Sequence, residues 1–141
     1  MKNRLPILLL ISGLAVLSYV GYAQTGSPDA SKFDGKWLRR VTDEDHARHS
    51  PFAGQPQAAA AGKLIFAENC AKCHGAEANG RSTPPARPSL RSERVRHATD
   101  GDIAWLLRNG NPYKGMPSWS SLPEQQRWQV IAFLRTLPPA K

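Results

Sequence analysis

The segment Cys70-Ala71-Lys72-Cys73-His74 constrains this chain more than any other stretch. It contains the only two cysteines among the 141 residues, and they lie three positions apart. On a helix, that spacing places both thiols on one face. His74 follows directly, so two thiols and one imidazole are gathered in a very short segment. The pattern C-x-x-C-H is the attachment signature of c-type haem.

Haem attachment explains the spacing, because two thiols add to the two vinyl groups of one porphyrin and a neutral imidazole then ligates the iron. Three other interpretations stay open here: a disulfide redox motif, half of a zinc site and a structural disulfide. The redox motif requires a βαβ setting, which the sequence does not indicate. Zinc requires further ligands, which would have to come from His46, His49 and His97. We favour one covalent haem c, held by Cys70 and Cys73, with His74 on the iron.

A second iron ligand is predicted far along the chain. Met116 is the only methionine apart from the initiator, and it lies between Gly115 and Pro117 in a polar loop. Methionine more often fills gaps in a core, but Met116 does not belong to an apolar stripe. A thioether opposite a histidine raises the reduction potential of haem iron. With both axial positions filled, the iron only gains and loses one electron, which favours an electron carrier over an enzyme.

The N-terminus carries a targeting pattern. Lys2 and Arg4 precede an apolar run from Leu5 to Tyr22, and small residues precede a cleavage position after Ala23. The run is close to the shortest length that spans a membrane. Residues 1–23 are therefore either a cleaved signal peptide or a retained anchor. Either places the protein in the periplasm, or on the outer face of the bacterial cytoplasmic membrane if residues 5–22 are retained.

Residues 24–56 are expected to be a linker and an N-terminal extension. Phe33, Trp37 and Val41 form a short helical face in it, which would either dock on the main domain or belong to a loose tether. His46 and His49 are interpreted as solvated surface histidines, with a ligand role as the alternative.

Residues 57–141 are expected to form one domain of helices without strands. The first helix, residues 57–72, places Phe66, Cys70 and Cys73 on its buried stripe. Gly62 lies one turn before Phe66. A glycine inside a helix is locally unfavourable, and its presence predicts that another helix crosses closely there.

Two more helices are predicted from their capping residues. Residues 99–109 begin with the capping box of Thr99 and Asp102, and Gly110 stops them. The last helix begins with a second capping box, Ser121 with Glu124, and runs to about residue 136. A further helical turn is expected at residues 92–97, after an irregular loop.

These residues resemble the class I c-type cytochromes, the small mono-haem family of bacteria. The resemblance covers about residues 57–138. It rests on the C-x-x-C-H motif, Gly62, Phe66, the segment Gly115-Met116-Pro117-Ser118-Trp119, Trp128 and Phe133. It implies an all-α cytochrome c fold, in which three to five helices wrap one covalently attached haem and the first and last helices cross near Gly62.

The resemblance also implies a role for a proline in the loop after the haem motif. In this family the carbonyl of that proline accepts a hydrogen bond from the histidine ligand. Pro88 matches it best and Pro85 is a weaker candidate. Such a bond would orient the imidazole and tune the iron.

Charge and composition restrict the partners. The net charge is +8, which favours redox proteins with an acidic docking surface or an anionic membrane surface. The expected compartment excludes nucleic acid. No small-molecule substrate is expected, since the chain has no nucleophile–base pair and no Gly-rich phosphate loop. Two alternatives stay open: a permanent cytochrome subunit of a membrane oxidoreductase, with residues 24–56 as a docking arm, and a haem peroxidase or gas sensor, in which Met116 would leave the iron.

Overall fold

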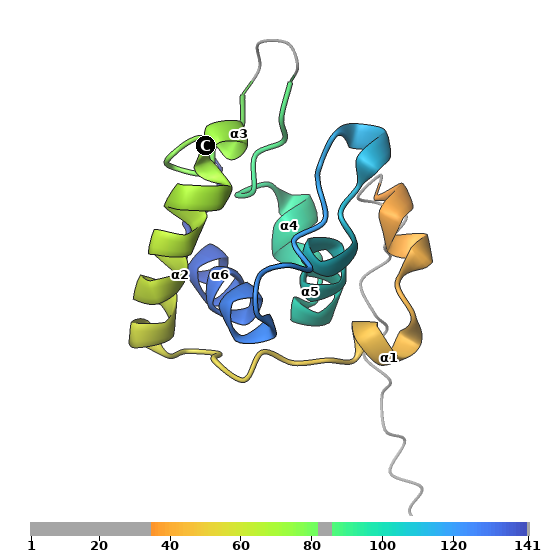
Figure 1. Cartoon of the computed structure of the whole chain (residues 1–141), viewed down its shortest axis with the longest axis horizontal. Coiled ribbons are helices and arrows are strands. Elements are labelled where there is room, and N and C mark those ends of the chain that lie inside the picture. Colours follow the sequence, from red (N-terminus) through yellow and green to blue (C-terminus); the bar gives the residue numbers. More distant parts are fainter. Residues whose placement is uncertain (1–34, 82–85, 141) are drawn as a thin grey trace, which may run out of the picture.

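A computed structural model describes residues 35–81 and 86–140 of the chain. The expected signal or anchor segment, Phe33 and Pro85 lie outside these residues. The described elements follow the order η2 (Lys36–Arg40, a 3-10 helix), α1 (Asp43–His46), α2 (Pro56–Asn69), α3 (Ala71–His74), α4 (Glu93–His97), α5 (Asp100–Asn109), η3 (Pro112–Lys114, a 3-10 helix) and α6 (Glu124–Thr136) (Figure 1).

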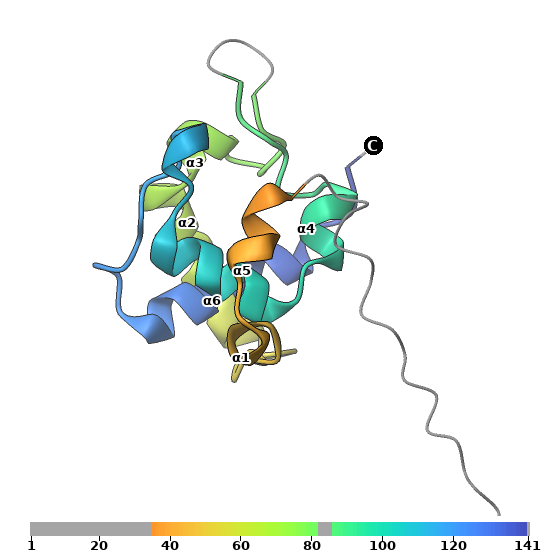
Figure 2. The ribbon, with the colours of Figure 1, turned by 90° about the vertical axis from the view of Figure 1, so that its right-hand side faces the viewer.

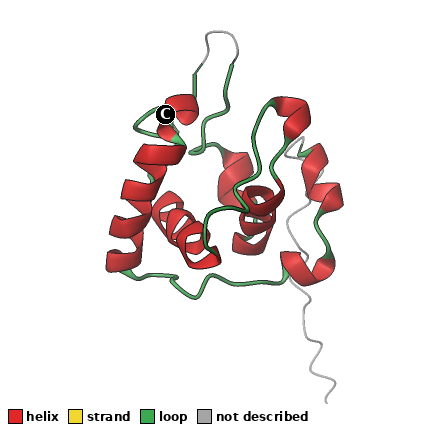
Figure 3. Cartoon of the chain, viewed as in Figure 1, coloured by secondary structure: helices red, strands yellow, loops and turns green. Residues whose placement is uncertain are grey.

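The all-α prediction is confirmed. Within residues 35–81 and 86–140, strand-like pairing is limited to two isolated bridges, Arg81 with Arg87 and Asn111 with Met116 (Figure 3). None of the helices in the described part of the chain is both long and apolar enough to cross a membrane.

Helices α2 and α6 cross in close contact, with α2 at the left edge of the fold in Figure 1. A Cβ atom built on Gly62 would lie 1.9 Å from the backbone oxygen of Gln129 in α6. Glycine is therefore required for this close approach, as the sequence predicted, and a side chain there would force the helices apart at a cost of about 1–3 kcal/mol. Beside the crossing, the rings of Phe66 and Phe133 pack with centroids 5.2 Å apart.

The first predicted helix is wrong in one respect, because it does not continue through residue 72. Helix α2 ends at Asn69, whose side-chain amide bonds back to the Ile65 carbonyl, a bond typical of Asn near helix ends. At Cys70 the backbone turns to φ −115° and ψ −34°. The amides of Cys73 and His74 then both donate to the Cys70 carbonyl, at 3.1 and 3.0 Å, and begin α3.

Helix α5 begins and ends as predicted. The Thr99 hydroxyl accepts from the Asp102 amide at 3.1 Å, and the Asp102 carboxylate accepts from the Thr99 amide at 2.8 Å, which completes the capping box. Gly110 ends the helix at φ +70°, a conformation that favours glycine.

The described part of the N-terminal extension docks on α5, and η2 and α1 both lie beside that helix (Figure 2). The ring of Trp37 stacks on that of Trp105, with centroids 6.5 Å apart and an interplanar angle of 13°. Arg108 pairs with the Asp45 carboxylate at 2.9 Å. Of the two possibilities left open by the sequence, docking is therefore correct for residues 35–50.

The prediction for the two histidines is half correct. His49 is exposed, but His46 is not a free surface histidine. Its Nδ1 atom lies 2.8 Å from a carboxylate oxygen of Asp102, which is only 2% exposed. The extension thus supplies a partner for a buried carboxylate, which would otherwise be left with one oxygen unpaired.

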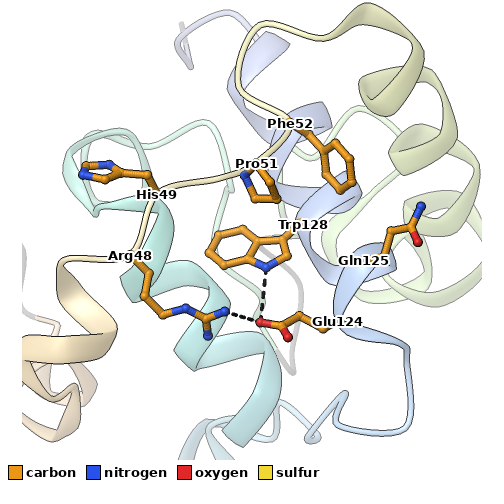
Figure 4. Close-up of a pocket in the computed structure, with 7 residues that line it drawn as sticks. All are labelled: Arg48, His49, Pro51, Phe52, Glu124, Gln125 and Trp128. Atoms are coloured by element: carbon orange, nitrogen blue, oxygen red, sulfur yellow. Dashed lines mark hydrogen bonds and ion pairs between the residues drawn. The ribbon is translucent and has the colours of Figure 1, made fainter.

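The predicted capping box of the last helix is wrong. The Leu122 amide donates to the Trp119 carbonyl at 3.1 Å, so residues 119–122 form a turn instead of the first turn of a helix. Helix α6 therefore begins at Glu124, after Pro123. The Glu124 carboxylate accepts hydrogen bonds from Arg48 and from the Trp128 indole instead (Figure 4).

Candidate haem attachment site

The two cysteines lie at the junction of α2 and α3. Both are half-buried free thiols. Cys70 packs against the central core, the main cluster of buried apolar residues, which includes Phe66 and Ile131. Burial, and to a lesser extent the neighbouring Cys73, raises the pKa of the Cys70 thiol to about 11. Redox-active C-x-x-C motifs have lowered thiol pKa values. The environment of this pair therefore argues against the disulfide redox interpretation.

His74 is oriented by the loop that follows it. Its Nδ1 atom lies 3.1 Å from the carbonyl oxygen of Pro88. Since a carbonyl only accepts, Nδ1 carries the proton and donates, which leaves the lone pair on Nε2. Partial burial lowers the pKa of His74, the bond to Pro88 opposes that shift, and Arg87 adds to it. The imidazole is thus neutral near pH 7, as a metal ligand must be.

Backbone hydrogen bonds fix the position of Pro88 within an otherwise irregular loop. Arg81 and Arg87 exchange both of their backbone bonds, at 2.9 and 2.8 Å. The Gly80 amide donates to the His74 carbonyl at 2.8 Å, and a Cβ on Gly80 would lie 2.5 Å from the Arg87 oxygen. The Pro88 carbonyl is therefore held against the C-x-x-C-H segment.

Met116 lies in the loop that follows α5. The Asn111 amide donates to the Met116 carbonyl at 2.8 Å, and the Met116 amide donates to the Asn111 carbonyl at 3.0 Å. The Met116 side chain is half-buried and packs against the central core. The loop begins with η3, which lies at the same end of the molecule as α3 (Figures 1 and 2).

The side chain of Arg87 brings these two loops together. A guanidinium nitrogen of Arg87 lies 3.4 Å from the position of a Cβ on Gly115, next to Met116. The sequence alone presented Arg87 as one surface cation among many. The signal that could have selected it is its place directly before Pro88.

The residues present fit a haem. They supply two thiols, an imidazole with a lone pair on Nε2, and a thioether. Half-buried apolar side chains that border the core provide a surface for a flat macrocycle, and they include Cys70, Leu90, Val95, Met116 and Trp119. Among the residues that the structure describes, the Nε atom of Arg87 is buried and has no hydrogen-bond partner, and a haem carboxylate is an acceptor that would satisfy it.

Zinc fits less well. His46 is bonded to Asp102, and His97 lies 2.8 Å from the Glu93 carboxylate. In residues 35–81 and 86–140, no three His, Cys, Asp or Glu side chains gather as a metal site.

Comparison with known proteins places the chain in a family. Residues 57–134 match the family model described as cytochrome C oxidase, cbb3-type, subunit III. Over 87 residues the chain is 34% identical to cytochrome c-554(547) of Halothiobacillus neapolitanus, which covers 56% of this chain and 96% of that relative. Over 85 residues it is 38% identical to the cbb3-type cytochrome c oxidase subunit FixP of Rhizobium meliloti (strain 1021), which covers 59% of this chain and 29% of FixP.

The chain thus spans almost the whole of one relative and less than a third of the other. The matched region contains the C-x-x-C-H segment, Pro88, Met116 and the α2–α6 crossing. Membership implies covalently bound haem c and a role in electron transfer. The protein belongs to the cytochrome c family represented by cbb3-type oxidase subunit III, and it is a class I c-type cytochrome.

Proposed function

We propose that the protein carries single electrons between redox partners through one haem c, attached at Cys70 and Cys73 and ligated axially by His74 and Met116. The observation that carries the proposal is the 3.1 Å contact between His74 Nδ1 and the Pro88 carbonyl. It sets the tautomer and the direction of the imidazole, as partners outside the coordination sphere do for metal-bound histidines.

Each residue has a distinct task in this proposal. Bound haem supplies an iron that changes by one electron. His74 offers a neutral nitrogen, and the Pro88 carbonyl keeps its ring from rotating. Met116 offers a soft thioether from a loop whose backbone is paired with Asn111. The half-buried apolar side chains beside them exclude water, which limits the reorganisation that accompanies electron transfer.

The visible spectrum of the matured protein tests this proposal. We expect low-spin spectra in both the ferric and ferrous forms, and no change when carbon monoxide is added to the ferrous form. A high-spin spectrum or rapid carbon monoxide binding would contradict closed axial ligation. It would instead favour a peroxidase or a gas sensor.

We further propose that the partner presents an acidic surface. The chain carries a net charge of +8, and exposed Lys72 and Lys114 belong to α3 and η3, which flank the site. Opposite charges speed encounter, and salt screens them. The second-order rate with a redox protein partner should fall at least several-fold as ionic strength rises from about 0.01 to 0.15 M. The rate with a neutral small-molecule reductant should not depend on ionic strength. If the rate with the protein partner is equally independent of ionic strength, electrostatic attraction to an acidic surface is refuted.

A permanent subunit of a membrane oxidoreductase is the second candidate, and the similarity to FixP favours it. Residues 35–50 pack on α5 of their own domain, so a docking arm would have to use side chains that stay exposed there, such as Arg39 and His49, or other residues of the extension. Co-purification with a membrane complex at high salt would favour this candidate, and recovery as a free protein would favour the mobile carrier. In either case we propose a periplasmic site of action, with residues 1–23 as signal peptide or anchor.

A further inference from the structure

Arg87 has an unusual environment. Its Nε atom is buried and has no hydrogen-bond partner among the residues that the structure describes. Its Nη1 atom donates at 3.2 Å to the carbonyl of Ala86, a weak local contact. Buried polar groups are normally paired, and a charged donor without an acceptor is costly.

Two other arginines in this fold, Arg135 and Arg91, do have strong acceptors. Arg135 donates to the Asp100 carboxylate at 2.7 Å and to the Ala98 carbonyl at 2.6 Å. Arg91 donates from Nε to the Pro138 carbonyl at 2.8 Å. The environment of Arg87 is therefore specific to its place in the fold.

That place is the contact between the two loops of the candidate site. The backbone of Arg87 is fixed by its paired bonds with Arg81, and its carbonyl leads directly into Pro88. Its guanidinium lies against Gly115, which precedes Met116.

We propose that Arg87 is a positioning residue, which donates from Nε to a haem carboxylate and holds the reduction potential high. This inference rests on the proposed function. Haem carries two carboxylates on its edge, and a guanidinium pairs with a carboxylate more strongly than with a neutral acceptor. The ferric iron carries one more positive charge than the ferrous iron, so a fixed cation nearby favours the ferrous form.

The loss of Arg87 should lower the reduction potential in two ways. Removing the cation takes away a charge that disfavours the ferric state. It also leaves the haem carboxylate without its counter-charge, and that anion then stabilises the ferric state. Both effects lower the reduction potential.

The test compares three variants of the mature holoprotein: Arg87→Gln, Arg87→Lys and Arg94→Gln. Arg94 is exposed on α4, so its variant loses the same charge from a solvent-exposed position. In an equilibrium redox titration, we expect Arg87→Gln to shift the ferrous-to-ferric ratio about ten-fold toward ferric at fixed applied potential, which equals about 59 mV. Arg94→Gln should shift it less than about two-fold, because an exposed charge is screened.

Arg87→Lys keeps the charge and loses the planar donor, so its potential should lie closer to wild type than that of Arg87→Gln. The redox-difference infrared spectrum gives a second readout, in which the haem carboxylate band should move in Arg87→Gln and stay in place in Arg94→Gln. Equal potentials for Arg87→Gln and Arg94→Gln, or an Arg87→Lys potential as low as that of Arg87→Gln, would overturn the inference. An unmoved carboxylate band would also overturn it.

These outcomes are distinct from failure of the proposed function. If the wild-type holoprotein is low-spin and does not bind carbon monoxide, the carrier proposal survives and the variants decide the role of Arg87 alone. If the wild type lacks covalent haem or binds carbon monoxide, the proposed function and this inference fall together.

Discussion

A Cys70→Ala/Cys73→Ala variant should lose most of its helical signal and its cooperative melting transition. The reason is the small size of the core. Of the large side chains in the described residues, only Phe66 and Ile131 are less than 2% exposed. A domain of this length buries little apolar surface, and a covalently held macrocycle adds apolar material and joins distant segments. Haem attachment should therefore decide whether α2, α5 and α6 remain assembled.

The measurement is far-UV circular dichroism with thermal and urea melts. Lys72→Ala is the matched control, because Lys72 lies exposed between the two cysteines and has no proposed contact with haem. We expect Lys72→Ala to mature and melt like the wild type, and the double variant to lose more than about half of its ellipticity at 222 nm. A double variant with full helix content and one sharp transition would show that the polypeptide core suffices.

The parts of the fold that were predictable depend on short-range signals. The capping box of Thr99 and Asp102 joins residues three positions apart, and the structure contains both of its hydrogen bonds. Gly62 is an exception in kind, since its partner in α6 is distant. The crossing could nevertheless be predicted, because glycine in a helix interior is unfavourable unless a close contact requires it.

The errors arose where a distant residue competes for a local group. Ser121 and Glu124 have the spacing of a capping box, but Arg48, 76 positions away, pairs with Glu124. His46 was interpreted as solvated because its partner Asp102 lies 56 positions away. In each pair one residue, Arg48 or His46, belongs to the extension, which lies outside the matched family region. No sequence pattern therefore indicated that the two partners would meet.

Helix α5 shows the same limit in its packing. Ile103, Leu106 and Leu107 form one apolar stripe in its sequence. Trp105 lies on the other side of the helix and is also buried, at 7% exposed, because Trp37 stacks on it. The candidate site was more accessible to sequence reasoning, since motif spacing and family resemblance selected its residues. Arg87 was not selected, because only the folded structure shows that its Nε is buried and lacks a hydrogen-bond partner among the described residues.

Met116→Ala should open the iron while leaving the loop in place. The backbone of Met116 is paired with Asn111 in both directions, and truncation of the side chain removes neither bond. The ferrous variant should bind carbon monoxide within the mixing time of a manual experiment. Loss of the soft thioether should also shift the ferrous-to-ferric ratio roughly a hundred-fold toward ferric at fixed potential.

Tyr113→Ala is the control, since Tyr113 lies in the same loop, is 88% exposed and has no proposed contact with the iron. If Met116→Ala stays low-spin and excludes carbon monoxide as Tyr113→Ala does, Met116 is not the ligand. Comparison with Arg87→Gln separates two ways of lowering a potential. Met116→Ala changes the coordination and admits carbon monoxide, whereas Arg87→Gln changes the field around a closed iron, so its spectrum stays low-spin while its potential falls.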